Sequence, residues 1–250
     1  MIDTIIQGDC LGVMRDMPDE SADLILCDLP YGTTSCSWDT IIPFEPLWAA
    51  YKRIIKPNGA IVLTASQPFT SALVMSNAAM FKHEWIWNKV RGTGFQIAKY
   101  RPMQQHESIL VFCRGSLNYF PIMTKRDIEK TSKCYTPSDS NPLKYNDGCA
   151  RTYTHRFPVS ILTYSNASQY NKLHPTQKPV ALFEYLIRTY TNEGEVVLDN
   201  CIGSGTTAVA CIRSSRHYIG IELEQKYVDI ANERICIEQS QLKLDLGGEG

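Results

Sequence analysis

Long apolar runs are missing from this chain of 250 residues. No stretch of about 18 apolar residues occurs, so the sequence predicts no helix that spans a membrane. The first residues, MIDTIIQGDC, also lack the basic-then-apolar layout of a secretion signal. Together these two absences predict a cytoplasmic protein.

Paired cysteines are missing as well. The nine cysteines are scattered from Cys10 to Cys236, with no CxxC pair and no His/Cys cluster at zinc spacing. An odd and scattered set argues against both a disulfide framework and a structural metal site. We therefore expect reduced thiols that serve mainly as small core residues.

Net charge is almost absent, at −1, but its distribution is uneven. Residues 82–178 carry 15 Lys/Arg against 6 Asp/Glu. Residues 1–81 carry 4 against 9, and residues 179–250 carry 6 against 11. A basic middle between acidic flanks indicates a face that meets a polyanion, although a merely solvated basic surface would give the same balance.

Apolar runs of strand length alternate with stretches of helix length. The runs expected to be buried strands are residues 4–7, 23–27, 60–64, 84–87, 108–113, 196–199 and 218–221. The stretches expected to be helices are residues 44–55, 68–78, 180–191, 206–214 and 225–239. This alternation predicts an α/β fold with a mostly parallel sheet and helices on both faces. The sequence KPNG at 56–59 is expected to end a helix and turn the chain into the next strand.

The segment 115–172 breaks this rhythm. It is rich in Ser, Thr, Asn, Pro, Lys and Tyr, and its apolar residues are too sparse for a core. An irregular segment of this length inside a domain indicates either a functional insertion or disorder. We expect one α/β domain formed by residues 1–114 and 173–250, with an inserted basic lobe at 115–172.

The strongest local signal is VVLDNCIGSGTTAVAC at residues 196–211. A hydrophobic strand ends at Asp199, and a glycine-containing turn leads into a helix. Gly203 and Gly205 permit unusual backbone angles and the close approach of a ligand, and the helix N-terminus offers free N–H groups to an anion. The next strand ends in Glu222, a carboxylate suited to the hydroxyl groups of a ribose.

This turn predicts a nucleotide-like cofactor without identifying it. It is neither GxGxxG nor GxxxxGK[ST]. A dinucleotide dehydrogenase is disfavoured, because only one strand–helix–strand unit follows the turn. A glycine turn that binds nothing is the structural alternative.

The second signal is LILCDLPYG at residues 24–32. The nitrogen of an aromatic amine is a poor nucleophile, because its lone pair is delocalised into the ring. The Asp28 carboxylate and the Leu29 main-chain carbonyl could accept both N–H hydrogens and favour the tetrahedral nitrogen that attacks. Pro30 restricts the turn, and Tyr31 offers a face on which an extruded base can stack.

In combination, these motifs resemble the circularly permuted beta group of DNA amino-methyltransferases. Residues 28–31 match the catalytic motif, residues 199–207 the cofactor loop, and residues 173–179 the group's HPTQKP signature. Residues 8–10 fall where the permuted chain contacts the cofactor's adenine. Residues 106–112 look like the strand that precedes the recognition region.

The resemblance implies a permuted, Rossmann-like methyltransferase sheet that binds S-adenosylmethionine, with a target-recognition region at 115–172. The implied catalytic residues are Asp28, Leu29, Pro30 and Tyr31. The implied cofactor-binding residues are Asp9, Cys10, Lys178, Asp199, Cys201, Gly203, Ser204, Gly205, Thr206, Thr207 and Glu222. Within this set, residues 203–207 would hold the methionine part with Lys178 close by, Glu222 the ribose, and Asp9 the adenine.

One residue departs from the family pattern. The second position of the catalytic motif is usually proline, and here it is Leu29, which leaves the main-chain carbonyl in place but makes the turn less rigid. Aspartate at the first position is typical of enzymes that methylate N6 of adenine, so Asp28 implies that product in duplex DNA. The alternatives are N4 of cytosine, another planar amine such as RNA adenine or a glutamine side chain, and a DNA-binding relative without activity.

A target base would have to be flipped out of the duplex to reach Tyr31. The loop 33–39, with Trp38, could close over that base, or Trp38 could belong to the core; His174 is expected to be a structural brace. The candidates for phosphate contacts are Lys125, Arg126, Lys130, Lys133, Lys144, Arg151 and Arg156. Base-edge contacts would come from 115–172. The resemblance also suggests a homodimer and leaves open a partner restriction endonuclease, a solitary enzyme or a phage-borne one.

Overall fold

An eight-stranded sheet forms the centre of the larger of two units in the computed structural model, which describes residues 2–32, 39–132, 150–166 and 177–247. This unit comprises Met1–Phe120 and Ser160–Gly250, and the smaller one comprises Pro121–Val159. The strands of the sheet are β1 (Thr4–Gln7), β2 (Ala22–Asp28), β3 (Ile55–Ala65), β4 (Phe81–Thr93), β5 (Gln104–Phe112), β8 (Ile161–Thr163), β9 (Val196–Asp199) and β10 (His217–Glu222). Their order is β1-β10-β9-β2-β3-β5-β4-β8.

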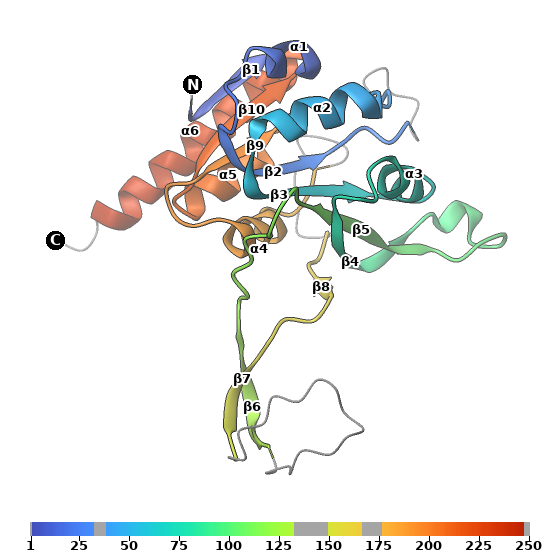
Figure 1. Cartoon of the computed structure of the whole chain (residues 1–250), viewed down its shortest axis with the longest axis vertical. Helices are drawn as coiled ribbons and strands as arrows, with labels where there is room; N and C mark the ends of the chain where they lie inside the picture. The colour runs from blue at the N-terminus through green and yellow to red at the C-terminus, as the bar shows by residue number, and fades with distance from the viewer. Residues whose placement is uncertain (1, 33–38, 133–149, 167–176, 248–250) are drawn as a thin grey trace. The chain divides into compact units, whose positions relative to one another are not determined.

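The sheet is mostly parallel, as expected. Strand β5 runs antiparallel to both of its neighbours, β3 and β4, and the other adjacent pairs are parallel. The helices are α1 (Cys10–Arg15), α2 (Phe44–Ile54), α3 (Phe69–Ser76), α4 (Val180–Tyr190), α5 (Thr206–Arg213) and α6 (Gln225–Gly247). Helices α2 and α3 cover one face of the sheet and α4 and α5 the other (Figure 1), which confirms the expected arrangement of layers.

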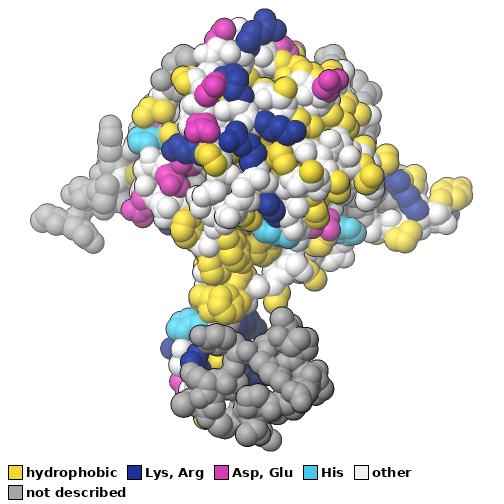
Figure 2. All heavy atoms as spheres, in the orientation of Figure 1, with side chains coloured by type: hydrophobic (Ala, Val, Ile, Leu, Met, Phe, Trp, Pro, Cys, Tyr) yellow, Lys and Arg dark blue, Asp and Glu magenta, His cyan; other side chains and the backbone are white. Residues whose placement is uncertain are grey.

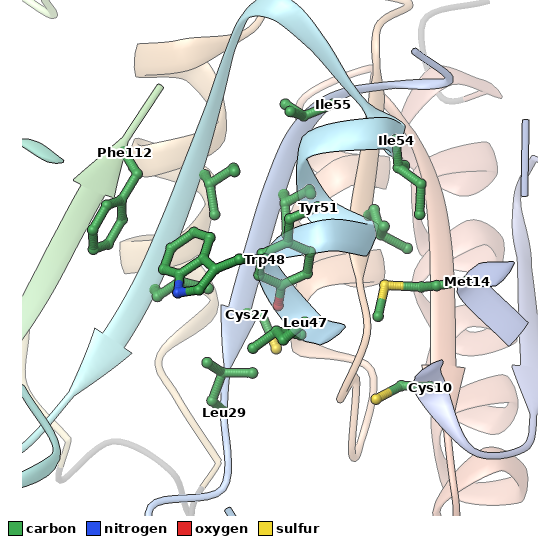
Figure 3. Close-up of a cluster of buried hydrophobic side chains, with 14 of the residues drawn as sticks. Cys10, Met14, Cys27, Leu29, Leu47, Trp48, Tyr51, Ile54, Ile55 and Phe112 are labelled. Atoms are coloured by element: carbon green, nitrogen blue, oxygen red, sulfur yellow. The ribbon is translucent and has the colours of Figure 1, made fainter. Parts of the chain in front are cut away.

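Alternating side chains of the central strands build a core on each face. Ile25 and Cys27 of β2 pack in a first core with α1, α2 and α3, while Leu24 and Leu26 pack in a second core with α4 and α5. Because successive strand residues point to opposite faces, a strand buried on both sides reads as a continuous apolar run. Figure 3 shows the first core, in which Tyr51 of α2 lies against the sheet.

The parallel strands place the predicted motifs at one edge. Asp28, Asp199 and Glu222 are the last residues of β2, β9 and β10, which are neighbours in the sheet. The carboxyl edge of an open parallel sheet is where ligands bind in such folds. The predicted catalytic turn and the glycine-rich loop, far apart in sequence, therefore meet at the same edge.

The KPNG sequence does not form the expected turn. Helix α2 ends at Ile54, and β3 begins at once with Ile55 and runs through KPNG. Gly59 has no left-handed conformation; instead, a Cβ there would lie 2.6 Å from the Asp23 carbonyl oxygen. Glycine is needed because β2 approaches closely where its register with β3 shifts, between Ala22 and Leu24.

Several elements were not expected. Helix α1 was missed, and β4 and β5 extend into a long hairpin well beyond residues 84–87 and 108–113. Strand β8 and the antiparallel strands β6 (Thr124–Thr131) and β7 (Thr152–Arg156) fall in the segment expected to be irregular. Strands β6 and β7 are almost wholly exposed, so no apolar alternation signalled them.

Candidate active site

A cavity of about 660 Å³ opens at the carboxyl edge of the sheet, a size typical of small-molecule and cofactor sites. The turn after β1, the predicted catalytic turn after β2, the glycine-rich loop after β9 and the end of β10 all line it. Every residue of the predicted catalytic and cofactor-binding sets lines this cavity except Gly205. The structure thus brings together residues that the sequence holds more than 200 positions apart, such as Asp9 and Glu222.

The Asp28 carboxylate is held on both oxygens. The Tyr31 hydroxyl donates to Oδ1 at 2.6 Å and lies 2.9 Å from the Thr64 hydroxyl, which also donates to Oδ1. Lys178 Nζ donates to Oδ2 at 2.6 Å. Thr64 faces Asp28 across the β2–β3 register, a pairing that the sequence alone could not reveal.

Tyr31 stays a neutral hydrogen-bond donor. Burial, the neighbouring Asp28 and Glu107 charges and its hydrogen bond to Asp28 raise the pKa of its phenol well above the usual value. Its ring stacks on Phe69, with ring centroids 5.2 Å apart and planes at 28°. Lys178 Nζ lies over the Tyr31 ring, 5.8 Å from its centroid.

Leu29 lines the cavity, and its side chain is also buried in the protein. Its side chain is 4% exposed and belongs to the first core (Figure 3). Insertion of this side chain into the core restrains the predicted catalytic turn at the position where the family pattern has proline.

Behind Asp28, charged side chains continue into the protein. Lys178 Nζ lies 3.4 Å from Glu107 Oε2, and Lys89 pairs with Glu107 Oε1. Burial opposes the charge on Lys178, but Asp28 and Glu107 more than offset it, so the pKa of Lys178 is raised and the ammonium stays charged. Lys178 was expected near the methionine part of the cofactor. The charged contacts of Glu107 and Lys89 were not expected, because the place of β4 and β5 in the sheet brings these two residues together.

Two glycines shape the loop after β9. Gly203, at φ +52°, donates its N–H to Glu222 Oε2 at 2.9 Å, and Glu224 donates its N–H to Oε1 at 2.9 Å. Gly205, at φ +82°, precedes α5, and a Cβ there would lie 2.9 Å from the Ala231 Cβ. Left-handed backbone and tight packing against α6 both require glycine at this position. Burial raises the pKa of Glu222 despite these N–H donors.

Asp199 stabilises the same loop through hydrogen bonds to two of its residues. It is 3% exposed, accepts the N–H of Cys201 at 3.1 Å on Oδ1, and accepts the Thr207 hydroxyl on Oδ2. Burial raises its pKa to about 7 against the opposing effect of these hydrogen bonds. Ser204 is fastened in turn by Arg234 of α6, which donates to its hydroxyl at 3.0 Å.

The predicted residues near the N-terminus flank the other side of the cavity. Asp9 caps α1 by accepting the Gly12 N–H on Oδ2 at 2.8 Å. Cys10 is 9% exposed, and its hydrogen bond with Cys201 and its burial raise the pKa of its thiol. Burial raises the pKa of Cys27 to about 12. Both thiols pack in the first core.

Some predicted residues lie outside the described part of the chain: Trp38, Lys133, Lys144 and His174, with the first half of the HPTQKP signature. The described candidates for phosphate contacts, Lys125, Arg126, Lys130, Arg151 and Arg156, all belong to the smaller unit. Within residues 2–32, 39–132, 150–166 and 177–247, no helix is long and apolar enough to cross a membrane. Those residues also contain no cluster of His, Cys, Asp or Glu arranged to hold a metal ion.

A family described as DNA methylase matches residues 22–233 of the chain. The chain belongs to the DNA methylase family. Two characterised relatives cover nearly all of this methylase. The Type II methyltransferase M.HpaI of Haemophilus parainfluenzae is 28% identical over 247 residues, covering 94% of this chain and 74% of its own. The DNA adenine methyltransferase YhdJ of Escherichia coli (strain K12) is 29% identical, covering 94% of this chain and 83% of its own.

The fold of the methylase is shared with a solved structure, the M1.HpyAVI–SAM complex. The TM-score is 0.62 and the identity 25%, with 92% of this chain and 98% of that chain covered. The expected methyltransferase-type α/β sheet is thereby confirmed.

Proposed function

We propose that this methylase transfers a methyl group from S-adenosylmethionine to N6 of an adenine flipped out of duplex DNA at a specific site. The observation that carries the proposal is that Asp28, at the start of the catalytic turn, shares one cavity with the glycine-rich loop and Glu222. A carboxylate that can accept an amine and a site for a nucleotide-like cofactor are the two elements that the reaction requires.

The residues present fit S-adenosylmethionine. Each oxygen of the Glu222 carboxylate accepts one main-chain N–H, at Gly203 or Glu224, and retains a lone pair for a ribose hydroxyl. The left-handed Gly203 brings the main chain itself to the cavity wall. When bound, S-adenosylmethionine supplies an electrophilic methyl group on a sulfonium sulfur.

Asp28 prepares the nucleophile. Its carboxylate and the Leu29 carbonyl accept the two N–H groups of the target amine, which localises the lone pair on nitrogen for attack on the methyl carbon. The bound cofactor would supply the methyl group and keep the electron pair of its methyl–sulfur bond, and the surplus proton of the amine would leave for water. No residue of the enzyme is consumed, so no regeneration step follows.

Adenine is favoured over cytosine by two observations. The first residue of the catalytic motif is Asp28 rather than serine, and the relative YhdJ is described as a DNA adenine methyltransferase. The chain order of catalytic turn, inserted segment 115–172 and cofactor loop supports the permuted beta arrangement, with the insertion as the target-recognition region. The resemblance to M.HpaI, a Type II methyltransferase, supports a place in a restriction-modification system.

The surface beside the cavity suits a polyanion. The β4–β5 hairpin projects from the sheet, and its end at the right of Figure 2 carries both hydrophobic and basic side chains. Arg91, Lys99 and Arg101 are exposed there, and Phe95 and Tyr100 are 79% and 88% exposed.

The β4–β5 hairpin lies beside the cavity that contains Asp28. Strand β5 pairs with β3 as far as Ala65 and Ser108, and the hairpin continues past that carboxyl edge. Thr93 and Gln104, at the base of its tip, line the cavity. A duplex lying across these basic side chains would bring its bases to Asp28.

The test is product analysis. Purified protein, labelled S-adenosylmethionine and mixed-sequence duplex DNA are incubated, the DNA is digested, and the methylated nucleoside is identified by mass spectrometry. Asp28→Ala and Asp28→Asn are run alongside, with the exposed Asp229→Asn as the matched control. N6-methyladenine from the wild type and the control, and none from the Asp28 variants, supports the proposal. N4-methylcytosine would overturn the base assignment, and no methylated nucleoside despite intact cofactor binding would overturn DNA methylation.

A further inference from the structure

Four charged groups of alternating sign form a buried chain that begins at Asp28. Lys178 follows Asp28, Glu107 follows Lys178, and Lys89 follows Glu107. The side chains of Lys178, Lys89 and Glu107 are 8%, 9% and 13% exposed. Burying a charge is costly unless the charge is paired. Each of these charges lies beside one of opposite sign, which offsets that cost.

The Lys178 ammonium occupies both contacts that the target base would make, one with Asp28 and one with the ring of Tyr31. Its ammonium donates to Asp28 Oδ2 at 2.6 Å, in the way that the amino group of a base would donate. The same ammonium lies 5.8 Å over the Tyr31 ring, the ring on which the base would stack. Asp28 Oδ1 already accepts Tyr31 and Thr64, so Oδ2 is the oxygen from which a donor can be displaced.

Glu107 offers Lys178 another partner. Its Oε1 pairs with Lys89, but its Oε2 is buried and, among the residues that the structure describes, receives no hydrogen bond. A buried acceptor without a donor is costly and calls for an explanation. Lys178 Nζ is already 3.4 Å from this atom, so a small shift would complete the hydrogen bond.

We propose that Lys178 is a placeholder: it holds Asp28 in the free enzyme and passes its ammonium to Glu107 Oε2 when the amino group of the target base arrives. The inference rests on the proposed methylation at Asp28. The exchange replaces one donor by another at Asp28 Oδ2 and satisfies Glu107 Oε2 at the same time. No proton changes hands: Lys178 keeps a carboxylate partner in Glu107, and Asp28 exchanges its ammonium partner for the neutral N–H of the base beside its hydroxyl donors. Lys178 and Glu107 are thus positioning residues for the target base.

The test measures how much the amino group of the target base contributes to the affinity of the enzyme for DNA. A short duplex in which the wild type methylates a mapped adenine is compared with the same duplex carrying unsubstituted purine, which lacks the amino group. Dissociation constants for both duplexes are measured with S-adenosylhomocysteine bound, so inactive variants can be assayed. The preference for adenine over purine reports displacement of Lys178 from Asp28.

Glu107→Gln is expected to reduce this preference about tenfold, the effect of weakening one charge-assisted hydrogen bond. Lys178 then has no second carboxylate to accept it. Affinity for S-adenosylhomocysteine is expected to stay within about twofold of the wild type. The matched control is Glu238→Gln, which removes a carboxylate of similar exposure (11%) from its pair with Arg213, outside the cavity. Its preference is expected to equal that of the wild type.

A double-mutant cycle tests whether Glu107 acts on the target base through Lys178. In a Lys178→Met background, adding Glu107→Gln is expected to change the preference less than about twofold, because Glu107 acts through Lys178. Lys178→Gln replaces Lys178→Met if thermal unfolding shows that the latter does not fold. Equal losses from Glu107→Gln with and without Lys178, or no loss at all, would overturn the inference. Failure of the wild type to methylate any DNA would instead overturn the proposed function, and that is established before the variants are made.

Discussion

Glu222 accepts the main-chain N–H of Gly203 at 2.9 Å and so joins the end of β10 to the loop after β9. The carboxylate is therefore oriented before any ligand binds. Replacing it by a neutral amide weakens its acceptor oxygens and the bond to Gly203 together. A site organised in advance loses less entropy when it binds its ligand.

For Glu222→Gln we expect S-adenosylmethionine to bind about tenfold or more weakly, the effect of losing hydrogen bonds to a charged acceptor. Isothermal titration calorimetry measures this directly. Glu224→Gln changes an exposed neighbouring carboxylate and serves as the control. Since burial raises the pKa of Glu222, wild-type affinity should also fall as the solution is made mildly acidic, and the variant should lack that part of the pH dependence. Unchanged affinity in Glu222→Gln would remove Glu222 from the cofactor site.

Substitutions of Leu29 are expected to change the stability of the protein more than its catalytic rate. Because its side chain is buried in the first core, Leu29→Ala should lower the free energy of unfolding by about 2–5 kcal/mol. The acceptor is its main-chain carbonyl, so kcat per folded molecule should fall by less than about tenfold. Urea unfolding and single-turnover methylation measure the two effects. Leu29→Met, which conserves volume, should cost less than about 1.5 kcal/mol; a lost kcat with intact stability would show that the side chain itself takes part in the reaction.

Asp199 should give the protein a stability that depends on pH. Burial raises its pKa from 3.8 to about 7 in the folded state, so the folded protein binds a proton that the unfolded chain releases. Its contribution is largest below pH 3.8 and is lost as the pH rises through about 7. Urea unfolding at pH 5, 6 and 7 should show the free energy of unfolding of the wild type falling relative to Asp199→Asn by up to about 1.4 kcal/mol per pH unit. A difference that is constant over this range would mean that Asp199 is ionised throughout.

The β4–β5 hairpin predicts how DNA binding responds to salt. If Arg101 contacts a phosphate, Arg101→Ala should make the slope of log K against log salt concentration less steep by about 0.9. Lys226→Ala removes an exposed charge on α6 and should leave the slope unchanged. Fluorescence anisotropy with labelled duplex DNA at several salt concentrations gives both slopes. Equal slopes for Arg101→Ala and the wild type would place the DNA elsewhere.

The fold class and the main site residues could be predicted from sequence because each has a local signal. Apolar runs mark the strands, and the ends of β2, β9 and β10 carry residue types whose chemistry is recognisable at Asp28, Asp199 and Glu222. Parallel strands then place those ends at one edge without further information. The expectation for KPNG failed because the strand, through its close approach at Gly59, overrode the turn preference of Pro, Asn and Gly.

The partners of Asp28 had no such signal. Thr64 reaches Asp28 through the register of β2 with β3, and Glu107 reaches Lys178 through the place of β5 in the sheet. Register and strand order are set by the packing of the whole molecule, so no window of sequence contains them. Lys178 was singled out from its motif, but its contact with Asp28 was not foreseen.

The place of β1 in the sheet has a consequence for how the protein is made. Thr4 and Gln7 pair with Ile219 and Glu222 of β10, and among the described residues β1 has no other neighbour in the sheet. As the ribosome releases the chain from its N-terminus, β2, β3 and the catalytic turn emerge long before β10. Strand β1 must therefore wait, unpaired, for β10, the last strand in the described part of the chain. A nascent chain can assemble around Asp28 early, but it cannot close the side of the cavity that Glu222 lines until β10 has emerged.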